Sequence, residues 1–282
     1  MKLHVCLESI GVIGPGLPDW PHAADVLAGR TPYASARTVL PPPASLPPAE
    51  RRRTGPVVRT ALAVGHEAVT ASGRDATTLT AVFAASGGDG QNCHAICDTL
   101  AGDDRQLSPT RFHNSVHNAP AGYWSIAARA QAASNVLCAH DGSFGAGLLE
   151  SLCQVAVDGV PSLLIAYDAD YPEPLHTERP IADAFGVALV FAPLNAGGAP
   201  TPGLAHIEAQ ITDAPATRLA SPELEALRVD NPAARVLPLL EAIAAQRPAS
   251  VVIDYLPETR VRIDVSFPHP GAAQTHHAEP AP

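Results

Sequence analysis

Two pairs of side chains near the middle of the sequence have spacings that could support metal chemistry. Cys93 and Cys97 flank a histidine in the run CHAIC, and His113 and His117 stand four residues apart. A structural zinc site needs four ligands, and no further ligands follow the cysteine pair at a matching spacing. The histidine pair lacks the glutamate of a zinc-protease HExxH motif, because position 114 is Asn114. The sequence therefore predicts no metal site, and we expect Cys93 and Cys97 to be packed thiols on one face of a helix.

A second candidate for chemistry is the run CAHDGSFGAG, which follows an apolar strand and begins a helical segment. A strand, a turn and a helix can hold an activated nucleophile at the helix N-terminus, where the helix dipole favours an anion. The turn residues are Asp141, Gly142 and Ser143. Their spacing is one residue short of the Gly-x-Ser-x-Gly elbow of hydrolases. Cys138 and Ser143 stay as alternative nucleophiles with His113 or His117 as base, although we expect Cys138 to be packed in the strand.

Strands and helices alternate through the first two thirds of the sequence. Apolar runs predict strands over 3–13, 78–86, 162–168, 185–193, 204–213, 250–256 and 260–267. The run 134–143 predicts a strand that includes Cys138 and leads into a turn over 139–143. Helical spacing of apolar residues predicts helices over 19–29, 56–73, 91–102, 143–159 and 231–246. The run SLLIAYD is apolar almost throughout, as in a strand covered on both faces. This order predicts an α/β fold whose sheet has helices on both faces.

Composition narrows the function classes. The formal net charge is -10, so the chain offers no basic surface for the phosphates of a nucleic acid. The basic run ERRRTG (50–55) is short and is expected to be a solvated helix start or an edge that contacts a partner. Five cysteines without a secretory signal predict a reduced, cytoplasmic protein, and no apolar run is long enough for a membrane span. Residues 267–282 lack apolar periodicity and are predicted to be a disordered tail.

Several of these segments, taken in order, resemble the N-terminal half of a β-ketoacyl synthase, a condensing enzyme of the thiolase fold. The family's first strand, glycine turn and helix resemble SIGVIGPGLPDWPHAADVLAGRTPY, and its second strand resembles LTAVFAASGGDG. The segment that crosses the dimer interface resembles LSPTRFHNSVHNAPAGYWSIAA. The nucleophile strand, elbow, helix and following strand resemble SNVLCAHDGSFGAGLLESLCQVAVDGVPSLLIAYD, and the return to the sheet resembles ERPIADAFGVALVFAP. The resemblance covers residues 3 to 212 and implies a thiolase-like mixed sheet in a ketosynthase-like domain over 1–266.

The sequence departs from an active synthase at the elbow. In the family a cysteine nucleophile stands about one and a half dozen residues before the glycine that ends the helix, here Gly159. Counting back without gaps reaches Gly142, which carries no thiol. Active synthases also take two histidines from a second half of similar size, and we expect this chain to lack most of that half. A thiolate without a supporting histidine is a poor condensing catalyst.

With these departures, the sequence resembles the chain-length-factor-like subunits of type II polyketide and aryl polyene synthases. The resemblance implies a non-catalytic subunit that forms a heterodimer with a full-length β-ketoacyl-ACP synthase, meets the acyl carrier protein only indirectly and needs no cofactor. It places the strand residues Asn135 and Leu137 at the subunit interface. The residues it implies for the far end of the partner's acyl tunnel are Phe112, His113, Val116 and His117. The alternative is an active acyltransferase or decarboxylase that uses Cys138 or Ser143, and an unrelated α/β hydrolase is a third reading.

Overall fold

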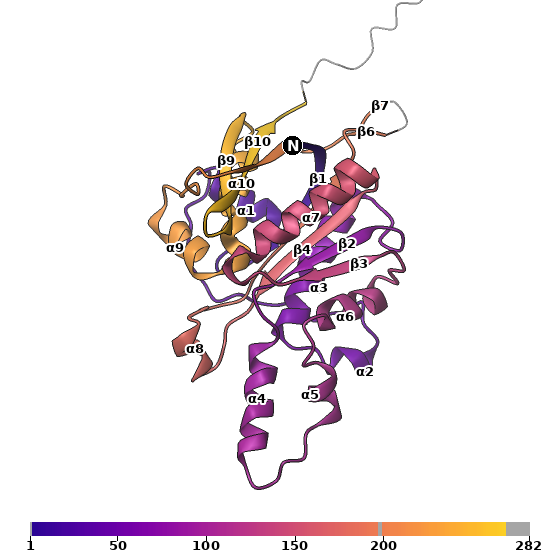
Figure 1. Ribbon diagram of the computed structural model, residues 1–282, viewed down its shortest axis with the longest axis vertical. Helices are drawn as coiled ribbons and strands as arrows, with labels where there is room; N and C mark the ends of the chain where they lie inside the picture. The colour runs from indigo at the N-terminus through magenta and orange to yellow at the C-terminus, as the bar shows by residue number, and fades with distance from the viewer. Residues whose placement is uncertain (1, 197–198, 269–282) are drawn as a thin grey trace, which may run out of the picture.

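One mixed sheet of eight strands forms the centre of the protein (Figure 1). The computed structural model describes residues 2–196 and 199–268. The strands are β1 (Leu3–Ile13), β2 (Thr80–Ala84), β3 (Ser134–Leu137), β4 (Ser162–Asp168), β5 (Phe185–Ala192), β8 (Ala205–Thr212), β9 (Ala249–Leu256) and β10 (Thr259–Ser266). Their order is β3-β2-β4-β5-β1-β8-β10-β9, with β3, β2 and β4 parallel and the remaining pairs antiparallel. A short separate hairpin joins β6 (Asn195–Ala196) to β7 (Ala199–Pro200).

Helices cover both faces of this sheet, as the sequence predicts. One face packs against α1 (Trp20–Leu27), α7 (Ser143–Asp158), the 3-10 helix η2 (Pro232–Val236) and α10 (Leu237–Ala244). The other face packs against α3 (Pro56–Ser72) and α6 (Ala119–Ala127). β4 and β5 are buried along their whole length, because they lie in the middle of the sheet between the two helical layers. The predicted mixed sheet with helices on both faces is confirmed.

The helix patterns in the sequence account for how α3 and α7 pack. Val57, Ala61, Val64 and Ala68 recur at helical spacing on α3, and all four are buried. Phe144, Leu148, Leu152 and Val155 do the same on α7. Gly73 and Gly159 end these two helices in the left-handed conformation, which glycine adopts without steric cost. The two long helices therefore fix the elbow and the sheet edge relative to the core.

A helical projection extends away from the sheet and consists of α4 (Gly90–Ala101) and α5 (Pro109–His113) (Figure 1). Cys93 and Cys97 lie on α4 and are exposed, so the expectation that they are packed thiols is wrong. Their helix leaves the core instead of lying against the sheet, which the spacing of its residues did not indicate. The remaining short elements are α2 (Pro48–Arg51), η1 (His140–Gly142), α8 (Leu175–Glu178) and α9 (Pro222–Asp230).

Two sequence expectations on the strands need correction. The strand expected to include Cys138 ends one residue earlier, at Leu137, and the expected turn follows through His140, which has a φ of 51°. Cys138 lies after that strand and is exposed instead of packed in it. Most of the expected tail lies outside the described residues, since the description ends at residue 268. Within the part of the chain that is described, no helix combines the length and the apolar character needed to cross a bilayer.

Candidate functional site

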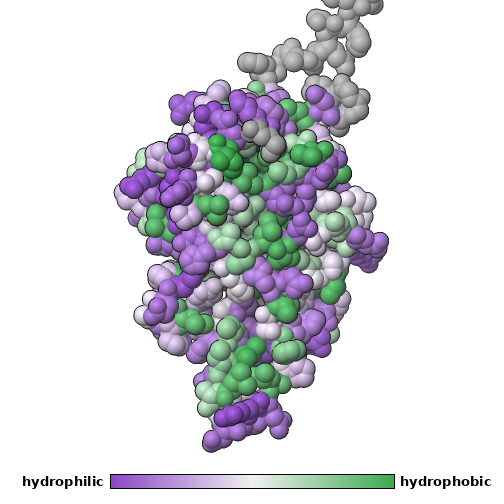
Figure 2. All heavy atoms as spheres, viewed as in Figure 1, coloured by the Kyte–Doolittle hydropathy of each residue, from purple (hydrophilic) through white to green (hydrophobic). Residues whose placement is uncertain are grey.

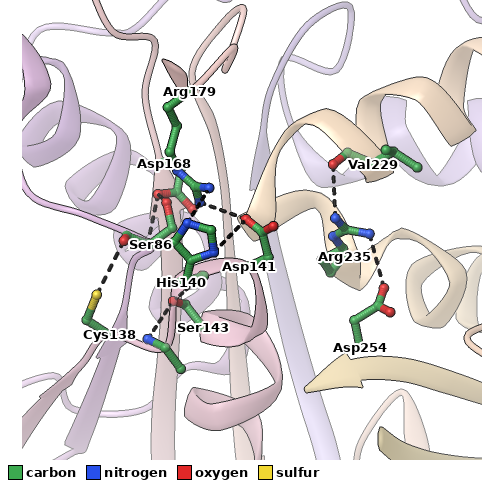
Figure 3. Close-up of polar contacts among 11 residues, drawn as sticks. Ser86, Cys138, His140, Asp141, Ser143, Asp168, Arg179, Val229, Arg235 and Asp254 are labelled. Atoms are coloured by element: carbon green, nitrogen blue, oxygen red, sulfur yellow. Dashed lines mark hydrogen bonds and ion pairs between the residues drawn. The ribbon is translucent and has the colours of Figure 1, made fainter. Parts of the chain in front are cut away.

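The candidate site lies where the parallel strands β2, β3 and β4 end. Ser86 follows β2, Cys138 follows β3, and Asp168 ends β4, so their side chains meet at one edge of the sheet (Figure 3). The Cys138 thiol donates to the Ser86 carbonyl oxygen at 3.3 Å. The Ser86 backbone N–H and hydroxyl donate to Asp168 Oδ1 at 2.9 and 2.6 Å. The elbow and the N-terminus of α7 stand directly beside this cluster.

The elbow has no room for a side chain at Gly142, the position that the sequence assigns to the family's nucleophile. A Cβ built on Gly142 would lie 2.8 Å from the Tyr255 carbonyl carbon and closer still to its oxygen. Gly145, one turn further along α7, meets the backbone of Asp254 in the same way. Strand β9 therefore lies against the N-terminus of α7. A cysteine at position 142 would require β9 to move.

The other side chains of the elbow serve the turn itself. Ser143 is buried, accepts a hydrogen bond from the Ala139 N–H at 2.9 Å and donates to the His140 carbonyl oxygen at 2.7 Å. Its hydroxyl closes the 3-10 turn at the start of α7, and both of its hydrogen bonds go to the backbone. Neither His113 nor His117 is a hydrogen-bond partner of Ser143 or Cys138. The arrangement thus offers no nucleophile–base pair of the kind that activates serine or cysteine.

His140 is the histidine of the elbow, and its partners decide what it can do. Arg179 Nη1 lies 2.9 Å from His140 Nε2, and Arg179 Nη2 donates to Asp141 Oδ1 at 2.8 Å (Figure 3). A guanidinium has only donors, so Nε2 of the imidazole must accept. The lone pair that a general base would use is therefore engaged by Arg179. This contact links His140 and Asp141 of the elbow to Arg179 in one polar network.

Asp168 is the most perturbed carboxyl of the cluster. Burial raises its pKa from 3.8 to about 7, against the opposing effect of the hydrogen bonds from Ser86. Its second oxygen, Oδ2, is buried without a hydrogen-bond partner among the described residues, and so is the hydroxyl of the neighbouring Tyr167. Within the same part of the chain, no group of three or more histidine, cysteine, aspartate or glutamate side chains could hold a metal ion.

An open apolar groove runs along α5 and α6. It has a volume of about 660 Å³, and its walls include Phe112, His113, Val116 and Ile126. Phe112 is 68% exposed and Val116 50% exposed, which is unusual for large apolar side chains close to each other. His117 does not line this groove, because its ring borders a much smaller cavity beside Tyr167, and its Nε2 is buried without a partner among the described residues. The four predicted tunnel residues are therefore neighbours, but His117 faces a different space.

Apolar residues also gather on the surface of the helical projection, above a hydrophilic tip (Figure 2). On α4 the exposed members are Cys93, Cys97 and Leu100. Asp103, Asp104 and Arg105 follow at the exposed tip. The projection thus adds a second apolar surface beside the groove of α5 and α6.

Strand β3 forms one edge of the sheet and is open on its outer side. The Ala81 N–H donates to the Ala133 carbonyl oxygen, and the Ala85 N–H donates to that of Leu137. Peptide groups alternate in direction along a strand, so Ser134 and Val136 direct theirs away from β2. No hydrogen bond reaches these outward groups from the described residues. The opposite edge is covered, because Thr217 exchanges hydrogen bonds with Val252 of β9 at 2.9 Å in both directions.

A mixed sheet with this strand order, a strand–turn–helix elbow at its edge and an open β3 define a thiolase-like ketosynthase fold. The model of the β-ketoacyl synthase N-terminal domain matches residues 27–228, so the chain belongs to the β-ketoacyl synthase family. No curated protein sequence matches the chain.

Solved structures agree with this assignment at the level of the fold. A ketosynthase in complex with its chain length factor from Xenorhabdus doucetiae has a TM-score of 0.68 at 20% identity, covering 93% of this chain and 99% of that one. The ishigamide ketosynthase/chain length factor has a TM-score of 0.70 at 14% identity, covering 95% and 100%. A type II polyketide synthase acyl-carrier protein in complex with its ketosynthase has a TM-score of 0.71 at 12% identity, covering 95% and 100%. Ketosynthases and their complexes with chain length factors are thus the structural neighbours of this chain.

Sequence reasoning missed two parts of the site. It did not find the contact of Arg179 with His140 and Asp141, and it did not find that β9 covers the elbow. These partners are separated by about forty and more than one hundred residues, and no local pattern links them. The glycine at position 142 was the one available signal.

Proposed function

We propose that this protein is a non-catalytic, chain-length-factor-like partner of a full-length β-ketoacyl-ACP synthase. Gly142 is the observation that carries the proposal. The nucleophile of the family needs a side chain at the N-terminus of α7, and the carbonyl of Tyr255 fills the space that such a side chain would take. The engaged imidazole of His140 adds to this, because the elbow has no free base. A chain with this elbow contributes a surface to a synthase instead of a reaction centre.

The proposed contact with the synthase is the open edge of β3. The outward N–H and C=O groups of Ser134 and Val136 can pair with the edge strand of a homologous sheet and extend it. Asn135 and Leu137 lie on the same strand and would be covered by that pairing. The apolar groove on α5 and α6 would meet the partner below the joined strands.

The groove itself suggests how this subunit would act on the product. Phe112, His113 and Val116 expose an apolar wall in an open space of about 660 Å³. Such a wall fits an acyl chain only when a second surface closes it. We assign Phe112 and its neighbours to the far end of the synthase's acyl tunnel, where their bulk limits chain length. The acyl carrier protein would deliver substrate to the synthase and meet this subunit indirectly, in a cytoplasmic assembly for fatty-acyl or polyketide products of the aryl polyene type.

The exposure of Cys138 favours a second candidate function, an acyltransferase or decarboxylase that uses this thiol. Among the described residues its thiol makes one hydrogen bond, to the Ser86 carbonyl oxygen, and no histidine contacts it as a base. Alkylation with iodoacetamide separates the two functions. Loss of condensation on selective modification of Cys138 supports the acyltransferase, and unchanged condensation by the complex supports the partner function.

A substitution on β3 tests the pairing. Because the N–H of Val136 points outward, Val136→Pro removes an outward donor and leaves the ladder with β2 intact. Val136→Ala is the matched control, since it shortens the same side chain and keeps the N–H. Each form is purified with the full-length ketosynthase encoded beside it, and the molar mass is measured by light scattering. We expect a one-to-one complex for the wild type and for Val136→Ala and separate subunits for Val136→Pro. Equal complex formation by all three forms would refute pairing through β3.

A further inference from the structure

One charged side chain makes hydrogen bonds to the open edge strand. Asn135 Nδ2 of β3 donates to Glu150 Oε1 of α7 at 2.6 Å, and Gln154 Nε2 donates to the same oxygen at 3.0 Å. No lysine or arginine occurs from Ser134 to Asp158, so neither β3 nor α7 carries a cation. None of the ion pairs among the described residues includes Glu150. Its carboxylate therefore stands at the edge with no counter-charge from the described part of its own chain.

The surface around Glu150 is otherwise suited to self-association. An open edge strand readily pairs with an identical strand of a second copy. Leu149, Cys153 and Val157 form a partly exposed apolar stripe on α7, and Val157 is 69% exposed. Without a charged group, the strand and the stripe together would favour a homodimer.

When two identical edge strands pair antiparallel, a two-fold axis perpendicular to the sheet relates the two copies. The same face of the sheet therefore lies on the same side in both copies. The α7 helix of one copy would then lie beside the α7 helix of the other. Neighbouring strands are about 4.8 Å apart and Glu150 lies over Asn135, so a two-fold axis near Asn135 would bring the two Glu150 carboxylates to face each other across the joint. Like charges brought together across an interface oppose the association.

We propose that Glu150 makes the β3 edge selective for a different chain. The edge disfavours a second copy of this protein, and it favours a homologous edge strand whose own helix presents a cation or a hydrogen-bond donor opposite Glu150. Discrimination between partners then comes from a repulsive element as well as an attractive one. This inference rests on the proposed function for the identity of the preferred partner, but the exclusion of the homodimer stands on the geometry of the edge alone.

Charge variants at one position test the proposal. Glu150→Gln removes the repulsion, and Glu150→Lys restores it with the opposite sign. Glu258→Lys is the matched control, because Glu258 is exposed in the turn between β9 and β10 at the other end of the sheet and the change in net charge is the same. Self-association is measured by sedimentation velocity over a concentration series for each variant and for an equal mixture of wild type with Glu150→Lys.

We expect the wild type, Glu150→Lys and Glu258→Lys to stay monomeric alone. Glu150→Gln and the mixture should dimerise, with a dissociation constant lower than that of the wild type by about fivefold or more. Adding Val136→Pro to Glu150→Gln should abolish that dimer. The proposal would be overturned if Glu150→Gln and the mixture both remain as monomeric as the wild type. It would also be overturned if the wild type forms a homodimer that Val136→Pro dissociates.

Binding to the ketosynthase separates this proposal from the proposed function. Glu150→Lys should bind the full-length ketosynthase at least about fivefold more weakly than Glu258→Lys does. Equal binding by the two variants would overturn the preference for a cation or donor. If the ketosynthase binds none of the variants and the mixture still dimerises, the proposed function fails and the exclusion of the homodimer holds.

Discussion

Replacing Gly142 with alanine tests whether β9 closes the elbow. The backbone at this position has a φ of -88° and a ψ of 8°, which alanine adopts without strain, so the substitution adds only a methyl group. That methyl group would lie 2.8 Å from the Tyr255 carbonyl carbon. A main-chain carbonyl cannot rotate away as a side chain does, so either β9 or α7 must shift. Overpacking of this kind costs about 1–3 kcal/mol, and we place this case at the upper end.

Alanine also lowers the conformational entropy of the unfolded chain, which stabilises the protein by up to about 1 kcal/mol. The net loss in the free energy of unfolding should therefore be about 2 kcal/mol. The matched control is Gly122→Ala on α6, where no atom lies within 4 Å of the added methyl group. That variant should be more stable than the wild type by about 0.5–1 kcal/mol, since alanine favours a helix over glycine.

Equilibrium urea unfolding followed by circular dichroism measures both variants under the same conditions. The two midpoints should differ by about 1 M or more, with the Gly142→Ala midpoint below that of the wild type. A Gly142→Ala protein as stable as the wild type would show that the elbow has room for a side chain. The argument that a nucleophile is excluded at position 142 would then be refuted.

Two further predictions concern a buried carboxyl and the groove. Burial raises the pKa of Asp168 to about 7, so the folded state holds a proton that the unfolded state releases near 3.8, and stability falls as pH rises between these values. Asp168→Asn keeps the acceptor for Ser86 and should flatten the dependence of stability on pH in thermal melts from pH 4 to 8. Above pH 7 its free energy of unfolding should exceed that of the wild type by at most about 4 kcal/mol. An unchanged slope of stability against pH would contradict a neutral buried carboxyl. Phe112→Ala should leave stability within about 0.5 kcal/mol, because the side chain is mostly exposed. In the complex it should shift the products to longer chains by mass spectrometry, and an unchanged product distribution would remove Phe112 from the tunnel.

Much of the fold could be predicted because local patterns and burial agree. β1 runs from Leu3 to Ile13, as its apolar run indicates, and the apolar positions of α3 and α7 are the buried ones. The helix α9 was missed because its sequence PELEALRVD is largely polar. Its start signals were present, since Ser221 accepts from the Leu224 N–H and Pro222 occupies the first turn.

The site could be predicted less well than the fold, because its contacts join distant segments. The glycine at position 142 led to the prediction that the elbow lacks a nucleophile, but only the fold brings Tyr255 against that glycine. The exposure of Cys93 follows from the direction in which α4 leaves the core, and helical spacing does not encode that direction. The residue pattern of the sequence therefore located the elbow, but it did not indicate which segments pack around it.

Condensation activity of the separate and combined subunits tests the central claim most directly. Acyl and malonyl thioesters of the carrier protein are incubated with this protein alone, with the ketosynthase encoded beside it, and with the complex of the two. The complex is also prepared with Cys138→Ala. We predict no condensation by this protein alone and equal condensation by the wild-type and Cys138→Ala complexes. Condensation by the isolated protein, or its loss from the complex with Cys138→Ala, would contradict the account.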